Sequence, residues 1–505
     1  MNTPDSEMMS SRTLGIPHPV DMLSPPAWEI IAIAGLVAFY VLGDTLYGTD
    51  FFAFANNAGP VFLAAILMTS AWVTAQEDAV VMWLGLFWFR ITTAVYFGIG
   101  SMIHIFYNDT TLHDTQMFFY ALPENFFKYN TVIAVCVFFV LLYIRMFATI
   151  FKPPKPHPTT DSSDSVLLVC AVGFGGLGYL IKYAISIPHN LNLYGDAALP
   201  GMINSLSLLA PVGLFLMTLW CVRHAPRYIF AISLLLALDI FTGSLLFNKS
   251  EVLTSALVFT FALLQYKITR TRLVAAGLSI IFLFQALVPM VEFGRNELSR
   301  QRGNISEATL TDRFEIMAVY WGGNTQTRTG EEFQGSLARI AYATSSIPAI
   351  LLYDNGLPGN SLDNIFVVLI PRMLWPEKPI LNTGEQYNQL VSGRSGSASW
   401  MGIFAESYWN YGWWGAPLLM FAVAAAYFFI GRMTIRIMAE RRWFHFPVVL
   451  LGMGMGIRTD GELLLGIGIS ALIALVANFV GNAFDGVVRP LIEGSQKAVP
   501  QPLAR

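Results

Sequence analysis

Several short segments of the sequence carry charged and aromatic side chains of the types that bind phosphate and sugar. In chain order, these segments are 292–295 (EFGR), 371–379 (PRMLWPEKP), 384–388 (GEQYN), 406–415 (ESYWNYGWWG) and 458–462 (RTDGE), together with Arg394 and with Lys249 of the turn FNKSE. The planar guanidinium of arginine binds phosphate through two parallel hydrogen bonds, and such charge-assisted bonds are strong. This composition predicts a bulky anionic substrate, such as a lipid-linked sugar diphosphate at a membrane surface.

The segment 406–415 adds residues that suit sugar binding and proton transfer. Sugar rings stack on aromatic side chains, which gather in and near this segment as Tyr387, Trp400, Tyr408, Trp409, Tyr411, Trp413 and Trp414. Glycosyl transfer also needs a base that accepts the proton of the acceptor hydroxyl, and a carboxylate is the usual choice. Glu406 is the candidate base. Asn410 follows four residues later, so on a helix the two side chains share one face.

These residues also have structural interpretations that involve neither catalysis nor substrate binding. Tryptophan and tyrosine at the end of a membrane span commonly form an aromatic belt at the membrane surface. Glu406 is alternatively the ion-pair partner of a loop arginine. Arg458 and Asp460 are alternatively paired with each other across their turn.

The composition indicates an integral membrane protein. Of the 505 residues, 55% are hydrophobic and 12% are charged, which is about half the charged fraction of average soluble proteins. We predict an all-α polytopic membrane protein with about 12 transmembrane helices and a large structured extracytoplasmic loop containing amphipathic helices. The predicted spans are 28–47, 59–75, 79–106, 131–151, 166–187, 202–222, 228–247, 251–267, 272–293, 411–432, 444–457 and 461–483.

The lysines and arginines of the short loops predict the orientation of the chain, because cytoplasmic loops carry an excess of them. One set of alternating loops is rich in these residues, whereas the other set holds only Lys128, Lys249 and Arg458. We therefore place both termini in the cytoplasm and the arginine-rich loop outside. The resulting organisation is a cytoplasmic tail (1–27), a nine-span bundle (28–293), an extracytoplasmic catalytic loop (294–410), a three-span bundle (411–483) and a second cytoplasmic tail (484–505).

The extracytoplasmic loop is too long to be a simple helix connection, since such connections run to about 2–8 residues. Within it, residues 335–353 are amphipathic, and residues 362–375 are strongly apolar but too short to span a bilayer. We expect both stretches to be helices that lie on the outer leaflet or dip into it.

Charges inside predicted spans are costly and commonly functional or paired, and four such residues stand out, namely Arg90, Arg145, Lys182 and Asp239. Arg145 and Lys182 lie near span ends, where a long side chain can reach the interface. Arg90 lies near the middle of the third span and is a weaker candidate for substrate binding. Asp239 is expected to pair with Arg90 or to hydrogen-bond within the bundle.

The sequence lacks the motifs of several other enzyme classes. It has no Walker A segment, no dinucleotide fingerprint and no H-E-x-x-H, and none of its seven histidines lies in 294–409. The cysteines all fall inside apolar runs and are expected to be core residues rather than metal ligands or disulfides; they are Cys136, Cys170 and Cys221. The net charge of −3 carries no information about a nucleic-acid partner, and no basic tract suggests one.

These segments resemble the oligosaccharide repeat-unit polymerase family, also called O-antigen or Wzy polymerases. The resemblance covers roughly residues 241–484 and rests on a pattern of residues. The pattern comprises Gly243, Ser244 and Lys249 after an apolar span, Arg295 at the exit of a later span, the PR…WPEKP segment with its following G…YN, the residues Glu406, Tyr408, Asn410 and Gly412, and the late Arg458. Lys249 stands where an arginine is more often expected.

The resemblance implies an enzyme that transfers a growing glycan from undecaprenyl pyrophosphate onto the next lipid-linked repeat unit. The reaction takes place at the periplasmic face of the bacterial inner membrane and needs neither a nucleotide sugar nor a metal or other cofactor. The implied partners are the lipid-linked oligosaccharide and the bilayer, and further partners are a chain-length regulator and a flippase. The polymer is O-antigen, capsule or exopolysaccharide.

The resemblance also implies roles for single residues. Arg295, Arg372, Arg394 and Arg458 would hold pyrophosphate and stabilise the leaving group, and Glu406 would be the base. Asn410 and Tyr408 would orient the sugar. The remaining candidates for substrate binding are Lys249, Tyr387, Trp409 and Arg90.

Three other functions stay open from the sequence. An O-antigen ligase has a related architecture but typically carries a histidine in its outer loop, which this chain lacks. A polysaccharide transporter or flippase would be expected to show internal repeats and a polar site at mid-membrane, and we see no repeat. The third alternative is a non-catalytic scaffold in an envelope assembly complex.

Overall fold

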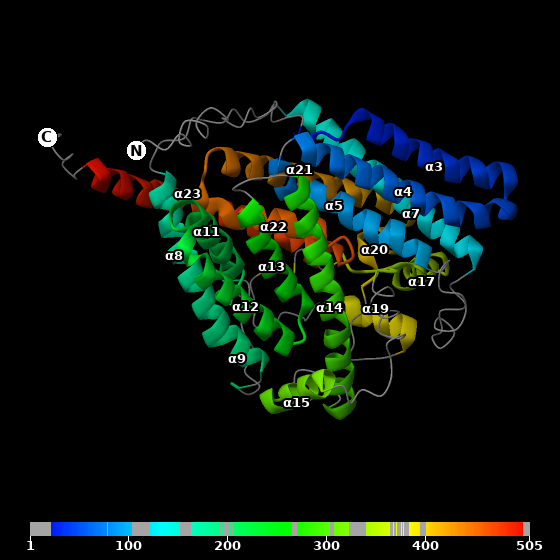
Figure 1. The fold of residues 1–505 in the computed structure, drawn as a ribbon. Helices are drawn as coiled ribbons and strands as arrows, with labels where there is room; N and C mark the ends of the chain where they lie inside the picture. Colours follow the sequence, from blue (N-terminus) through cyan, green and yellow to red (C-terminus); the bar gives the residue numbers. More distant parts are fainter. Residues whose placement is uncertain are drawn as a thin grey trace.

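The chain is built of helices throughout the part that the computed structural model describes (Figure 1). The structure describes residues 22–77, 79–103, 122–151, 163–191, 206–264, 270–302, 308–322, 340–363, 383–393 and 400–497, with a few single positions between these ranges. No strand occurs among these residues, so the predicted all-α class is confirmed for them.

Eight helices of the described ranges are long and apolar enough to cross a membrane. They are α3 (Ala27–Tyr47), α4 (Thr49–Glu77), α7 (Pro123–Ile150), α8 (Ser163–Ile181) with its continuation, α12 (Ile229–Leu245), α14 (Arg270–Arg302), α20 (Gly402–Tyr411) continued by α21 (Gly415–Ala439), and α23 (Ile469–Lys497). Two shorter apolar helices, α11 (Leu209–His224) and α22 (Phe446–Ile457), coincide with further predicted spans. The chain is a multi-pass membrane protein, while the total of twelve spans stays a prediction.

The helices form two groups that share one hydrophobic core. The first group consists of α3, α4, α5 (Gly85–Thr93), α7, α21 and α22, and the second consists of α8, α11, α12, α13 (Lys249–Leu264) and α14. In Figure 1 the second group is drawn in teal and green, and α3 and α4 of the first group in blue. Phe215 of α11 stacks on Phe446 of α22 at 4.3 Å between ring centroids, and Trp83 meets both rings edge-on. Aromatic packing therefore joins the two groups.

The third predicted span, 79–106, is broken in its described part. The 3₁₀ turn η1 (Ala79–Trp83) precedes α5, and the π-helical turn η2 (Ala94–Ile99) and the 3₁₀ turn η3 (Gly100–Met102) follow it. Such π-turns are frequent at functional sites. The rings of Tyr96 and Phe97 in η2 contact Tyr342, at 5.1 and 5.9 Å between centroids. The broken helix therefore reaches the loop residues that form the site described below.

Arg90 forms a buried ion pair with Glu29, and the prediction that it binds substrate or pairs with Asp239 is not supported by this geometry. Its Nε and Nη2 donate to the two carboxylate oxygens of Glu29 at 2.8 and 2.7 Å. Neither side chain is exposed by more than 1%. This bidentate ion pair joins α5 to the first turn of α3. Arginine can form it because its guanidinium is planar.

Lys182 is also buried and paired, so the prediction that it reaches the interface is wrong. Its Nζ donates to Asp239 at 2.7 Å and to Glu251 at 2.8 Å, and only 4% of the residue is exposed. Tyr179, Tyr183 and Ser255 also donate to the Asp239 carboxylate. Lys182 begins the π-helical turn η5 (Lys182–Ser186). The network thus connects the end of α8 to α12 and α13.

Helices continue through the described parts of the predicted extracytoplasmic loop. They are the end of α14, then α15 (Leu310–Trp321), α17 (Ala343–Asp354), α19 (Thr383–Ser392) and α20. The stretch 335–353 contains α17, which includes Pro348 as expected. Ile347, Ala349 and Ile350 of α17 are buried, and the helix packs on α7 and α20. Its expected place on or in the outer leaflet stays a prediction. Most of 362–375 lies outside the described residues.

We expect Arg90→Met to destabilise the protein strongly. The variant leaves the Glu29 carboxylate buried without its partner, which costs about 3–5 kcal/mol of unfolding free energy for a buried pair. The double variant Arg90→Met/Glu29→Met should recover most of this loss, because it removes both charges. Thermal unfolding of the purified protein in detergent measures the effect. Equal stability of the single variant and the wild type would contradict a structural role for the pair.

Candidate functional site

Two glycines of positive φ bound the short helix α20, which carries Glu406 and Asn410. Gly402 has φ +78° and Gly412 has φ +57°, a backbone conformation that L side chains rarely adopt. Gly412 ends α20, as glycine commonly ends helices, and the 3₁₀ turn η8 (Gly412–Trp414) leads into α21. Residues 402–410 of α20 are all buried. The sharp turns at both ends hold this helix inside the protein instead of letting it extend along one axis.

The Glu406 carboxylate is buried, and both of its oxygens accept hydrogen bonds. Oε1 accepts from the Ser361 hydroxyl at 2.7 Å, and Oε2 accepts from the backbone N–H of Leu463 at 2.6 Å. Leu463 is the first residue of the π-helical turn η10 (Leu463–Gly468). The first N–H groups of a helix have no partner within it, and a carboxylate there is favourable. Glu406 therefore caps a helix that lies 57 residues away in sequence.

Asn410 supports this arrangement from the same face of α20, as the four-residue spacing predicts. Its Nδ2 donates to the backbone oxygen of Glu406 and to the Ser361 hydroxyl, both at 2.8 Å. Ser361 thus accepts from Asn410 and donates to Glu406. The partners of Glu406 are a hydroxyl and an amide, not the loop arginine of the alternative interpretation.

The turn 458–462 lies directly against α20, so the structure brings two of the predicted segments together. The backbone N–H of Ile403 donates to the carbonyl of Thr459 at 3.1 Å. The Thr459 hydroxyl is buried and donates to the Thr92 hydroxyl of α5 at 3.0 Å. The turn is therefore attached both to α20 and to the end of α5.

Glu462 is a second buried carboxylate beside Glu406, and no role was predicted for it from the sequence. The two side chains are close enough for their charges to repel each other. The Thr383 hydroxyl forms a hydrogen bond with the Glu462 side chain. The Oε2 atom of Glu462 has no hydrogen-bond partner among the described residues. Only its place in the segment RTDGE pointed to Glu462. Ser361 and Thr383, which lie outside that segment, carried no signal in the sequence.

Asp460 is half-buried between a phenol and two cations. The Tyr342 hydroxyl donates to its Oδ2 at 2.6 Å. Burial raises the pKa of Asp460 above its ordinary value, and the Tyr342 hydrogen bond and the positive charges of Lys249 and Arg458 oppose this rise. Lys249 and Arg458 therefore lie near the same carboxylate, although one follows α12 and the other follows α22. The expected Arg458–Asp460 contact is electrostatic rather than a direct ion pair.

Arg458 is the exposed cation of this site. Its side chain makes no hydrogen bond or ion pair within the described part of the chain. An exposed guanidinium that interacts with Asp460 only through its charge keeps its N–H donors available to an anionic ligand. Among the predicted phosphate-binding residues, the structure thus brings Arg458 and Lys249 to the Glu406 region.

Arg295 occupies a different place. Its Nε donates to the backbone oxygen of Phe247 at 3.0 Å, in a small second core that includes Leu298 and Ile316. Phe247 itself has φ +50°, an uncommon value for a non-glycine residue. The bond holds the turn that leads to Lys249, so Arg295 contributes to that turn rather than contacting Glu406. Arg372 and Arg394 lie outside the described residues.

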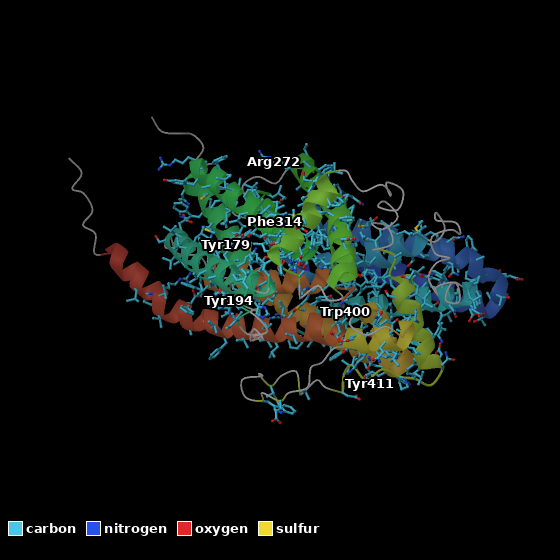
Figure 2. All side chains as sticks on the ribbon, turned by 90° about the horizontal axis from the view of Figure 1, so that it is seen from below. Tyr179, Tyr194, Arg272, Phe314, Trp400 and Tyr411 are labelled. Atoms are coloured by element: carbon cyan, nitrogen blue, oxygen red, sulfur yellow. The ribbon has the colours of Figure 1, made fainter. Side chains whose placement is uncertain are left out.

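The predicted aromatic cluster separates into buried and exposed members. Trp409 and Tyr387 are buried, meet edge-on at 5.6 Å and hydrogen-bond the backbone at Leu357 and Ser345. Buried rings with satisfied polar atoms are packing residues, so this geometry does not support sugar stacking by them. The exposed members of the cluster are Tyr411, Trp413 and Trp414. In Figure 2 Tyr411 lies at the edge of the molecule, and these three residues fit an aromatic belt.

Tyr408 points away from Glu406. Its hydroxyl donates to Asp354 Oδ1 at 3.0 Å, and the Lys128 ammonium lies 5.1 Å from its ring centre. Lys128 also pairs with Asp354 at 2.5 Å. The structure therefore places Tyr408 in a contact between α20, α17 and α7, which the prediction of a sugar-orienting role did not foresee.

Comparison of the chain with protein-family models, with curated proteins and with solved structures gives no match.

We expect Asp460→Asn to change how stability depends on pH. A pKa raised in the folded state stabilises the protein below the unfolded value of 3.8, and this stability is lost as the pH rises through the folded pKa. The stability of the wild type relative to Asp460→Asn should therefore fall as the pH rises above 3.8, as measured by thermal unfolding. Tyr342→Phe removes a hydrogen bond that lowers the pKa of Asp460. The loss of stability with rising pH should therefore be larger in that variant than in the wild type. A pH-independent difference would contradict the assignment.

Proposed function

We propose that the protein polymerises undecaprenyl pyrophosphate-linked oligosaccharide repeat units by glycosyl transfer at the outer face of the bacterial inner membrane. The observation that carries the proposal is the pair of buried carboxylates, Glu406 and Glu462, beside the turn that holds exposed Arg458. Glycosyl transfer from a diphosphate carrier needs a base for the acceptor hydroxyl and cationic donors for the leaving group. This site has both at one end of the helix bundle.

Charge supports a diphosphate as the anionic part of the substrate. The charges of Arg458 and Lys249 both act on Asp460, and Arg372 and Arg394 fall in the sequence between α17 and α20. Guanidiniums bind phosphate oxygens in a fixed bidentate geometry. Lys249 replaces an arginine as a point charge that binds phosphate without this geometry.

The two alternative enzyme and transport functions have weaker support. A ligase of the type considered above uses a histidine in its outer loop, and none of the histidines lies in 294–409. A transporter would carry its polar site near mid-membrane. The Lys182–Asp239 network is polar and buried, but its members bind one another. Three hydroxyl groups also donate hydrogen bonds to the Asp239 carboxylate. It therefore fits a structural connection better than a transport site.

The proposed orientation places the Glu406 site outside and both termini inside. Lys128, Lys249 and Arg458 all belong to the end of the bundle that holds Glu406 or its helix α20. The arginine-rich turns lie elsewhere, for example Arg442, which pairs with Asp485 at 3.0 Å. This distribution agrees with the excess of lysine and arginine in cytoplasmic loops.

The first test is a reconstituted reaction of purified protein with an undecaprenyl pyrophosphate-linked repeat unit and no nucleotide sugar. We expect a ladder of products of increasing length. Arg458→Ala should lower kcat/KM by about 10- to 100-fold, because a hydrogen bond to a charged group contributes about 1.5–3 kcal/mol. Arg227→Ala, at an exposed arginine in the turn between α11 and α12, is the matched control and should keep the wild-type rate.

The products separate the competing functions. Transfer of the glycan to lipid A without a ladder would establish a ligase and overturn the polymerase. Movement of the glycan across the bilayer without either product would establish a transporter. A ladder with equal rates for Arg458→Ala and Arg227→Ala would keep the polymerase but remove Arg458 from the site.

Cysteine labelling tests the orientation, because the three natural cysteines are buried. Glu124 is exposed at the start of α7, and Arg227 is exposed at the other predicted face. In right-side-out membrane vesicles, a membrane-impermeant maleimide should label Glu124→Cys. It should label Arg227→Cys only after the vesicles are permeabilised. The reverse pattern would invert the proposed topology.

A further inference from the structure

We propose that Glu462, and not Glu406, accepts the proton of the acceptor hydroxyl, while Glu406 is a positioning residue. The assignment rests on the proposed glycosyl transfer. It follows from the hydrogen bonds of the two neighbouring carboxylates, because only one of them, Glu462, has an oxygen that accepts no hydrogen bond from the described residues.

Both carboxylate oxygens of Glu406 accept a hydrogen bond from the protein. Its Oε1 accepts from Ser361 and its Oε2 from the N–H of Leu463. To accept a proton from the substrate, Glu406 would have to weaken the bond that caps η10 or the bond to Ser361. A buried N–H or hydroxyl that loses its acceptor costs about 1–3 kcal/mol. The side chain is thus suited to fix the turn 458–462 against α20.

Glu462 has the opposite arrangement. It is 5% exposed, the Thr383 hydroxyl holds the carboxylate, and Oε2 is buried without a hydrogen-bond partner among the described residues. Buried polar atoms in proteins are nearly always hydrogen-bonded, and an exception calls for an explanation such as a catalytic role. A hydroxyl group of the acceptor sugar would supply the missing donor.

The neighbours of Glu462 also suit this role. Asp460, two residues earlier, is engaged by the Tyr342 hydroxyl and lies near both cations. Arg458, four residues earlier, is exposed. A single turn therefore presents a cation toward solvent and a carboxylate with an unoccupied oxygen toward the interior. The cation can bind the departing diphosphate while the carboxylate binds the attacking hydroxyl.

The proposed step balances without any further reactant. The acceptor O–H bond breaks, and its proton moves to Glu462 Oε2. The acceptor oxygen forms a bond to the anomeric carbon of the donor glycan, and the bond between that carbon and the phosphate oxygen breaks. Undecaprenyl pyrophosphate leaves with the electron pair of this bond. Glu462 then releases its proton to water, which restores the carboxylate for the next addition.

The test compares Glu462→Gln, Glu406→Gln and the control Glu124→Gln in the reconstituted reaction. Glu124 is exposed at the start of α7, so its change should leave the rate unaltered. Loss of a general base lowers a rate by about 10²- to 10⁴-fold. We expect this loss for Glu462→Gln, with binding of the lipid-linked donor within about twofold of the wild type, as for an interaction made only in the transition state. Glu406→Gln should instead lower the unfolding temperature.

Rescue and the pH profile exclude a purely structural effect of Glu462. Formate is a small carboxylate that can replace a missing side chain, so it should restore turnover to Glu462→Ala but not to Glu406→Ala. Glu462→Gln should also lose the acidic limb of the pH–rate profile, and Glu406→Gln should keep it.

Two results would overturn the assignment. If Glu462→Gln keeps the wild-type rate and formate rescues Glu406→Ala, then Glu406 is the base, and the ladder of the wild type still establishes the polymerase. If the wild type makes no ladder, the proposed function itself fails, and the role of Glu462 fails with it.

Discussion

The bond between the Glu406 carboxylate and the N–H of Leu463 is the interaction on which the candidate site depends. The bond joins α20 to Leu463, the first residue of the π-helical turn η10. Its donor and acceptor lie 57 residues apart in sequence. Because the carboxylate is buried and the N–H has no partner in its own helix, each satisfies the other. The turn 458–462 precedes Leu463 directly, so this bond, together with those of Thr459, holds the turn in place.

The rest of the bundle supports this arrangement through buried charges rather than through apolar packing alone. Glu29–Arg90 joins α3 to α5, and Lys182 joins α8 to α12 and α13. A charge inside an apolar bundle requires a partner, which restricts how its helices can shift or rotate. α5 continues to Thr92, whose hydroxyl contacts Thr459 of the turn. The Glu29–Arg90 pair and the candidate site therefore share one rigid element.

The sequence predicted the features that depend on local composition and failed on those that depend on distant pairing. Runs of apolar residues located the helices, and a spacing of four placed Glu406 and Asn410 on one face. The pairing of Arg90 with Glu29 across 61 residues and the contact of Glu406 with Ser361 across 45 have no local signature. The aromatic residues of 387–414 illustrate the same limit. Composition shows that tryptophans and tyrosines gather there, but only packing decides which of them, such as Trp409, are buried.

The site separates charges of opposite sign by depth, and this separation has a chemical consequence. Arg458 is exposed and Glu462 is buried, although only three residues lie between them. A diphosphate attached to a lipid stays at the membrane surface, where an exposed guanidinium can reach it and water screens the remaining charge. A base must instead accept a proton away from water, because solvent would compete for its free oxygen. In the proposed function, the tight turn between α22 and η10 would meet both requirements with one short segment, because its single basic residue, Arg458, is exposed while Glu462 at its other end is buried.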